Sequence, residues 1–387
     1  MIESIGASTV TETRLKPNRS LADAPPKRVD VAKLLLEGRA FFALIVIIAV
    51  FSFLSPYYFT LGNFLTMATH VALFGILAIG MLLVILNGGI DLSVGSTLGL
   101  AGCVAGFLMQ GVTLKALGVV LFPPVWVVAV LACALGGFVG LVNGILIARF
   151  KVPAFVATLG VMYVARGAAL LMTNGLTYNN LGGQADLGNT GFDWLGFNRL
   201  FGVPIGVLVL AALAIIGSVV LNRTAFGRWL YASGGNERAA ELSGVPVKTV
   251  QVTVYVLSGI CAGIAGVILS SQLTSAGPTA GTSYELTAIA AVVIGGAALT
   301  GGRGNIRGTL LGAFVIGFLS DGLVIIGISS YWQTVFTGAV IVLAVLLNAV
   351  QYRRRVKLPS STDGPPTSQP QGTKSLKADP TLEKTAG

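Results

Sequence analysis

Charge is scarce in this sequence of 387 residues. Lys, Arg, Asp and Glu together make up 10% of it, against about 25% in an ordinary soluble domain. No residue of these four types occurs from Ala40 to Ile90, and none from Leu92 to Leu114. Apolar runs of this length leave no water-facing stripe on a helix. They argue against a soluble all-α protein with one large core.

Residues that carry covalent chemistry are also few. His70 is the sole histidine, and the three cysteines, Cys103, Cys133 and Cys261, stand in apolar segments without a disulfide pattern. No cluster of Cys, His and carboxylates has the spacing of metal ligands. The dipeptide Gly-Lys never occurs, so the chain has no phosphate-binding P-loop. We expect no enzymatic activity, no metal and no cofactor on this chain.

Apolar and small residues take the place of charge. Hydrophobic residues make up 54% of the sequence, and 51 residues are glycine. A bilayer core of roughly 30 Å needs about 20 apolar residues per spanning helix, and glycine lets such helices approach closely. The sequence predicts an all-α, polytopic membrane protein with about ten transmembrane helices. The predicted spans are residues 41–59, 63–86, 92–112, 124–148, 153–173, 203–221, 249–271, 284–299, 308–326 and 331–349.

Basic residues gather on one side of these spans. Because cytoplasmic loops carry the positive charge, both termini are predicted to be cytoplasmic. This distribution, rather than nucleic-acid binding, accounts for the formal charge of +10. The segments that hold 22 of the 25 Lys and Arg are 1–39, 149–152, 222–248, 300–307 and 351–387.

The two ends of the chain are polar and rich in Pro, Ser, Thr and charge. Segments 1–39 and 351–387 are therefore predicted to be disordered cytoplasmic tails, with a transmembrane permease domain at 40–350 between them. The longest predicted outer loop, residues 174–202, is rich in Asn and Gly. It is either a docking surface for a partner or a solvated connector.

The stretch NGGIDLSVGS, residues 87–96, interrupts the long uncharged region. Asp91 or Ser93 can cap the first amides of the next helix, and a carboxylate there complements the helix dipole. The stretch is either a capped tight turn or an interrupted helix that lines a substrate cavity. Its Gly88-Gly89 pair is followed by Gly95 and Gly99, and Gly301-Gly302 is followed by Gly308 and Gly312 with identical spacing, as in a weak internal repeat.

Ionisable side chains within spans are functional candidates by default. Arg166 either snorkels to the outer headgroups or faces a pathway, and a pair between Arg166 and Asp321 is geometrically possible. The candidate residues of a substrate pathway are His70, Asn87, Asp91, Arg166, Glu285 and Asp321.

Loop 222–248, NRTAFGRWLYASGGNERAAELSGVPVK, is too polar to span a membrane. Asn236 can cap a short helix there, and Gly244 and Pro246 can end it. This segment is either a short helix that another protein binds and moves, or an ordinary loop that lies on the lipid headgroups.

At this point four stretches make the chain resemble the permease subunits of bacterial ABC importers for ribose, xylose, galactose and related sugars. They run in the order of that family through most of residues 60–350. The stretches are NGGIDLSVGS (87–96), VPAFVATLGVMYVARG (152–167), FGRWLYASGGNERAAELSGV (226–245) and GPTAGTSYELTAIAAVVIGGAALTGGRGNIRGTLLGA (277–313).

The resemblance implies a multi-pass subunit of the bacterial inner membrane that imports a monosaccharide or a pentose-like polyol. It implies a homodimer, a periplasmic sugar-binding protein that delivers the substrate, and a separate cytoplasmic ABC ATPase that binds ATP and magnesium. Such a permease contacts the lipid bilayer and binds no nucleic acid.

The resemblance also places the ATPase contact in the coupling loop 222–248. The usual pattern is Glu-Ala-Ala, three residues, Gly, and Arg238 stands where the glutamate is usual. Asp321 is a second departure, because relatives tend to carry a neutral amide there. A carboxylate at that position can accept two hydrogen bonds from vicinal hydroxyls. The candidate coupling residues are Gly234, Gly235, Asn236, Glu237, Arg238, Ala239, Ala240 and Gly244.

Two other function classes are compatible with a polytopic chain. A self-sufficient secondary transporter of sugars or polyols would need an ion- or proton-coupling group, for which only Arg166, Asp321, Glu285 and His70 are available. A membrane enzyme that acts on lipid would need a catalytic constellation, which the sequence lacks.

Overall fold

The computed structural model describes residues 39–346, except 115–117, 330, 341 and 344–345. The predicted tails and the end of the tenth predicted span lie almost entirely outside this part of the chain. Residues 331–340 are helical, and the short 3₁₀ helix η2 covers Ala185–Leu187. The α-helices are α2 (Arg39–Leu54), α3 (Leu61–Leu86), α4 (Val94–Met109), α5 (Val125–Ala148), α6 (Ala154–Thr173), α7 (Trp194–Phe197), α8 (Ile205–Arg223), α9 (Ala225–Gly235), α10 (Glu237–Leu242), α11 (Val247–Leu273), α12 (Tyr284–Ile294) and α13 (Ile306–Ile325).

Six described helices are long and apolar enough to cross a membrane: α3, α5, α6, α8, α11 and α13. Helices α2, α4 and α12 are apolar but shorter. Each of the first nine predicted spans overlaps one of these nine helices. The structure thus agrees with a helical, multi-pass membrane protein. The count of ten spans, the domain limits and the side on which the termini lie stay predictions.

The first and eighth predicted spans, 41–59 and 284–299, each extend five residues beyond the helix that they overlap. The eighth has a clear local cause. Helix α12 ends at Ile294, and Gly296 follows it with a φ of 92°. Such a positive φ is readily adopted by glycine and rarely by other residues. The chain therefore leaves the helix five residues before the predicted end and enters a glycine-rich loop that leads to α13.

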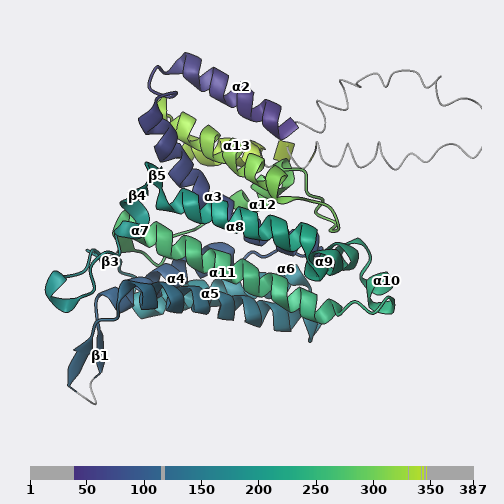
Figure 1. Cartoon of the computed structure of the whole chain (residues 1–387), viewed down its shortest axis with the longest axis horizontal. Helices are drawn as coiled ribbons and strands as arrows, with labels where there is room; N and C mark the ends of the chain where they lie inside the picture. The colour runs from purple at the N-terminus through teal and green to yellow at the C-terminus, as the bar shows by residue number, and fades with distance from the viewer. Residues whose placement is uncertain (1–38, 115–117, 330, 341, 344–345, 347–387) are drawn as a thin grey trace, which may run out of the picture.

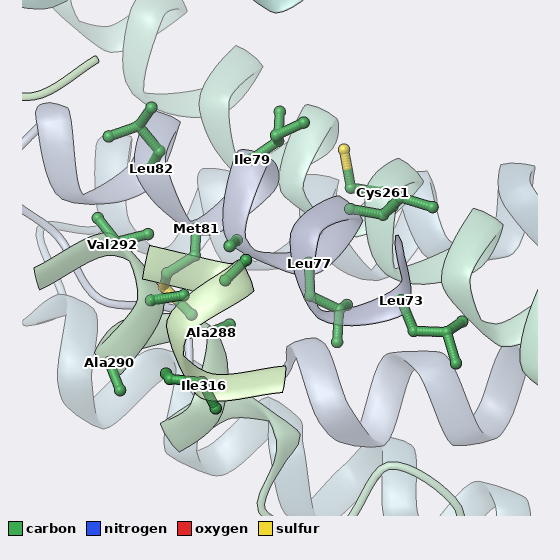
Figure 2. Packing of buried hydrophobic residues seen from close by; sticks show 14 of the residues in the cluster. Leu73, Leu77, Ile79, Met81, Leu82, Cys261, Ala288, Ala290, Val292 and Ile316 are labelled. Atoms are coloured by element: carbon green, nitrogen blue, oxygen red, sulfur yellow. The ribbon is translucent and has the colours of Figure 1, made fainter. Parts of the chain in front are cut away.

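Helix α3 runs through the middle of the bundle (Figure 1). In its most apolar stretch 83% of the residues are buried, because α8, α11, α12 and α13 pack around it. Figure 2 shows part of this core, in which Leu77 and Met81 of α3 lie among side chains of the neighbouring helices, Ala288 of α12 and Ile316 of α13 among them. The core of the protein is thus built around one apolar helix.

Helices α5, α6 and α8 are much more exposed than α3. Only 33%, 22% and 28% of the residues in their apolar stretches are buried. Large apolar side chains such as Phe138, Tyr163 and Ile215 are exposed on them. Apolar surface of this extent suits contact with lipid or with another membrane-embedded chain.

Short strand pairs gather at one end of the bundle, where no strands were expected (Figure 1). The three pairs within the described residues are all antiparallel. They join β1 (Val112–Leu114) to β2 (Val119–Leu121), β3 (Tyr178–Asn179) to β6 (Ser275–Ala276), and β4 (Arg199–Leu200) to β5 (Val203–Pro204).

Residues 174–202, the longest predicted outer loop, pack onto the helix ends at this same end of the bundle. Leu181 and Phe192 are buried. The Ser271 hydroxyl of α11 donates a hydrogen bond to the Phe192 carbonyl over 2.5 Å, and the Asn189 amide donates to the Met109 carbonyl over 3.0 Å. The loop is therefore a folded cap rather than a free connector. A partner contact on it stays a prediction.

Candidate functional site

Loop 222–248 folds into α9 and α10 at the end of the bundle opposite the strand pairs (Figure 1). Thr224 caps α9 by accepting a hydrogen bond from the amide of Gly227. Asn236 caps α10 in the same way, with 2.9 Å between its Oδ1 and the amide nitrogen of Ala239. Gly244, with a φ of 81°, follows the end of α10. The structure confirms the short capped helix that the sequence predicts.

Helix α10 presents most of its surface to the surroundings. Glu237 lies 3.2 Å from the ammonium of Lys151, and Arg238 lies 2.9 Å from the carboxylate of Glu241. Exposed ion pairs of this kind contribute little to stability, so these charges remain available for a partner. Leu242 is 75% exposed beside them, whereas Ala240 is buried and holds the helix to the bundle.

The end of α9 meets both interruptions of the transmembrane helices. The amide of Gly302 donates a hydrogen bond to the Leu86 carbonyl, at the end of α3, over 2.9 Å. A Cβ on Gly234 would overlap that same carbonyl oxygen, and a Cβ on Gly301 would lie 2.6 Å from the Gly234 carbonyl oxygen and 3.0 Å from the Gly88 nitrogen. We call Gly88, Gly234, Gly301 and Gly302 the glycine junction. The two glycine pairs that echo each other in sequence meet there.

Two side chains of α9 reinforce the glycine junction. The Ser233 hydroxyl donates to the Asn87 side-chain oxygen over 3.2 Å, and the Tyr231 hydroxyl donates to the Gly304 carbonyl over 2.8 Å. Burial raises the pKa of Tyr231, which keeps the phenol protonated as a donor. Asn87, a candidate pathway residue, thus lies at a contact with the coupling loop. The sequence did not indicate this contact, because the partners are more than 140 positions apart in the chain.

Asp91 is the centre of a buried polar network between α3 and α4. Its Oδ1 accepts hydrogen bonds from the amide and the hydroxyl of Ser93, over 3.0 and 2.6 Å. Its Oδ2 accepts from Ser258 of α11 over 3.0 Å, and the Asn143 amide of α5 donates to the Ser93 hydroxyl over 2.8 Å. Asp91 is 1% exposed. The predicted side-chain cap does not form, because Ser93, the N-cap residue of α4, makes no side-chain hydrogen bond to the first amides of the helix and Asp91 accepts only from Ser93 itself on this side. The burial of Asp91 still favours a tight turn over a residue that lines a cavity.

Arg166 and Glu285 lie against the glycine face of α4. The guanidinium of Arg166 donates to the carbonyls of Pro278 and Ala280 over 2.6 and 2.8 Å. A Cβ on Gly99 would lie 3.0 Å from this guanidinium, and one on Gly95 would overlap the Glu285 carboxylate. Arg166 therefore fixes the loop before α12. The pair of Arg166 with Asp321 that the sequence left open does not form, since each side chain has another partner in the described part of the chain.

Asp321 pairs with the sole histidine instead. Its Oδ1 lies 2.8 Å from Nδ1 of His70, across α13 and α3. Both residues line a cavity of about 640 Å³, which we call the α3–α13 cavity. It opens between α3, α7, α11, α12 and α13, and Phe74, Gln272, Tyr284 and Ser320 also line it. Among the six candidate pathway residues, only His70 and Asp321 do so.

Sequence reasoning missed Gln272 and Ser320. Gln272 follows Ser270 and Ser271, and Ser320 precedes Asp321, near the ends of two apolar helices. Polar residues at such positions commonly face water or headgroups. Only the packing of α11 and α13 brings them to the same cavity wall. No group of three or more His, Cys, Asp and Glu within the described residues could hold a metal ion.

The chain is similar to membrane proteins of known families. Residues 63–345 match a family model described as branched-chain amino acid transport system / permease component. The ribose import permease protein RbsC of Escherichia coli strain K12 is 44% identical over 315 residues, which cover 81% of this chain and 94% of the relative. RbsC of Bacillus subtilis strain 168 is 42% identical over 323 residues, covering 83% and 95%.

A more distant relative extends the comparison beyond ribose. The galactose/methyl galactoside import permease protein MglC of Escherichia coli strain K12 is 34% identical over 328 residues, covering 83% of this chain and 96% of the relative. No solved structure matches the chain.

Proposed function

The chain belongs to the family described as branched-chain amino acid transport system permease component, and from this premise we propose that it is the membrane-spanning permease subunit of an ATP-driven sugar importer. It moves a monosaccharide or polyol across the bacterial inner membrane. The observation that carries this proposal is the 44% identity to a ribose import permease over 94% of that protein. The relative named for galactose supports sugars as the substrate class.

The importer needs partners that this chain does not supply. We propose a second copy of the chain, a periplasmic sugar-binding protein, and a cytoplasmic ABC ATPase that holds ATP and magnesium. Helix α10 is the proposed contact with the ATPase. Its charged side chains and the exposed Leu242 form a small mixed surface that another protein can bind.

The glycine junction can transmit a movement of α10 to the transmembrane helices. When the ATPase moves α10, the adjoining α9 moves with it. Because Gly234 meets Leu86 and Gly302 through backbone atoms, no flexible side chain stands between α9 and the end of α3 or the loop before α13. A displacement of α9 therefore shifts both, and the bundle changes between its outward-facing and inward-facing arrangements.

Sugar uptake into proteoliposomes tests the proposed function. The vesicles contain this chain, the ATPase and the binding protein, and uptake of labelled D-ribose is followed with and without ATP. Uptake that needs ATP and all three proteins is the expected result. ATP-independent uptake by this chain alone would contradict the proposal and indicate a secondary transporter.

The variant Glu237→Ala/Arg238→Ala tests the proposed coupling helix. The exposed ion pairs of these two residues contribute little to folding, so the variant should fold. Its uptake of sugar and its stimulation of ATP hydrolysis should fall together, with or without a measurable loss of affinity for the ATPase. The matched control is Arg149→Ala, which removes an exposed charge from the end of α5, outside the coupling loop, and should leave uptake unchanged. Equal activity of the double variant and the control would remove α10 from the mechanism.

A further inference from the structure

We propose that the α3–α13 cavity is a sugar subsite within a single subunit, and this inference rests on the proposed function. Its ligand is a neutral monosaccharide or polyol with two vicinal hydroxyls. Asp321 accepts hydrogen bonds from these hydroxyls, and Gln272 donates to a ring or hydroxyl oxygen.

Two polar atoms of the cavity-lining residues lack a partner. Oδ2 of Asp321 and Nε2 of Gln272 are both shielded from water and make no hydrogen bond to any described residue. Buried polar groups in native proteins are nearly always paired, because an unmade hydrogen bond in a dry site is costly. Both atoms are shielded in this arrangement, so a ligand reaches them when the two side chains rotate toward the cavity that their residues line. An acceptor and a donor on residues of one cavity wall point to a ligand that supplies their partners.

His70 prepares Asp321 for such a ligand. An ionised carboxylate only accepts hydrogen bonds, so the Nδ1–H tautomer of His70 donates to Oδ1 over 2.8 Å. This contact occupies one oxygen and leaves Oδ2 for the ligand. The Asp321 side chain keeps 15% of its surface exposed. The carboxylate torsion is soft, so a small rotation brings Oδ2 toward an entering hydroxyl.

Aromatic side chains supply the apolar part of the subsite. Phe74 and Tyr284 line the cavity with ring centroids 5.1 Å apart and planes at 67°. An aromatic face carries partial negative charge and suits the C–H face of a sugar ring. The volume of about 640 Å³ lies within the range of small-molecule sites, about 300–1,000 Å³.

The charges of the wall select a neutral ligand. The carboxylate of Asp321 repels carboxylates and phosphates. His70 already donates to this carboxylate and occupies a position that an ammonium group would take. Arg199 also lines the cavity but is exposed, where water weakens its attraction for an anion. A hydroxyl group, which donates and accepts, fits Asp321 and Gln272 together.

Protection of a cysteine from labelling tests the subsite without the ATPase or the binding protein. Ser320→Cys places a thiol on the cavity wall, in a Cys133→Ser background because Cys133 is the native cysteine that is not buried. The full-length chain in lipid nanodiscs reacts with a maleimide in the presence of D-ribose, D-xylose, D-galactose or ribitol. L-Leucine and D-ribose 5-phosphate are the charged comparison ligands. Asp186→Cys, on the exposed η2 helix, is the reporter outside the cavity.

At least one neutral sugar or polyol should slow labelling at Ser320→Cys about threefold once its concentration is about twice the Kd. Labelling at Asp186→Cys should not change. Adding Asp321→Asn should raise the concentration for half-protection about tenfold or more, since hydrogen bonds to a charged acceptor are strong. Gln272→Met, which keeps the volume of the side chain, should act in the same direction if Asp321→Asn fails to fold.

Three results would overturn the subsite. The first is no protection by any of the four neutral ligands at about 100 mM, a concentration far above the roughly 1 mM Kd of weak binding. The second is protection by leucine or ribose phosphate instead, and the third is protection that both Asp321→Asn and Gln272→Met leave unchanged. These failures are distinct from a failure of the proposed function. A working ATP-driven importer without protection at Ser320→Cys would move its sugar by another route, whereas protection without ATP-driven uptake would keep the subsite and reject the importer.

Discussion

Gly234 and Gly235 stand next to each other at the end of α9, yet their surroundings differ completely. A Cβ on Gly234 would overlap the Leu86 carbonyl and lie 2.8 Å from the amide of Gly302, whereas a Cβ on Gly235 would meet nothing within 4 Å. The two residues are identical in type, and they differ only in whether backbone atoms of other segments lie close to the position of a Cβ. At the residue scale, this contact and the network around Asp91 are the positions where adding or removing a small group should change stability most.

Gly234→Ala should destabilise the protein by about 1–3 kcal/mol, because backbone atoms must shift to admit the methyl group. Gly235→Ala is the matched control and should be neutral or slightly stabilising. Thermal unfolding of the purified protein in detergent measures both. If Gly234→Ala and Gly235→Ala melt at the same temperature, the close contact at the glycine junction does not exist in solution.

Asp91→Ala should lower the free energy of unfolding by about 2 kcal/mol or more, because the buried donors of Ser93 and Ser258 lose their acceptor. Ser258→Ala removes only one of the donors and should cost about 1 kcal/mol. Denaturation of the two variants in mixed micelles gives the comparison. A smaller loss for Asp91→Ala than for Ser258→Ala would contradict the network.

At the scale of elements, α10 depends on its surroundings for its shape. It has six residues, which are too few for a helix that is stable alone. The cap at Asn236 and the buried Ala240 therefore hold it in place.

Asn236→Ala should weaken α10 by about 1 kcal/mol, whereas Asn236→Asp keeps a capping oxygen and should weaken it far less. Hydrogen exchange at residues 237–242 reports the local stability, and ATP hydrolysis in the assembled complex reports the coupling. Faster exchange and lower stimulation only for the alanine variant is the expected pattern. Equal behaviour of both variants would show that the cap does not matter for coupling.

The helices could be predicted from the sequence because long uncharged runs have few alternatives to a membrane-buried helix. The cap of α10 was predictable for a similar reason, since Asn236 and Gly244 act on residues close to them in the chain. The early end of α12 and the strand pairs were not, because they depend on backbone conformation and on contacts at the bundle end. The glycine junction, the pair of His70 with Asp321, and Gln272 beside it depend on contacts between distant segments, which one sequence does not reveal.

At the scale of the whole molecule, the two ends of the bundle are built differently (Figure 1). One end carries the strand pairs and the folded cap of residues 174–202, and the other carries α9 and α10. The charge distribution predicts that the second end faces the cytoplasm.

Labelling from one side of the membrane tests this orientation. In a Cys133→Ser background, an impermeant maleimide added to intact cells should modify Asp186→Cys, and it should modify Ser243→Cys only after the membrane is permeabilised. Both positions are exposed in the structure, so a difference in labelling reports the side of the membrane. The reverse pattern would invert the topology and exclude α10 as the contact with a cytoplasmic ATPase.

The central position of α3 also has a consequence for synthesis of the protein. The four helices that enclose it, α8, α11, α12 and α13, all follow it in the chain, so a ribosome makes α3 long before its cover exists. During that interval the nascent helix lies in lipid or in the insertion machinery. The mean hydropathy of its most apolar stretch is 2.5, which makes lipid a favourable environment for it. A polar substitution on α3 must then pass two tests: it must fit the finished core, and it must not expel the helix from the membrane before the core is assembled.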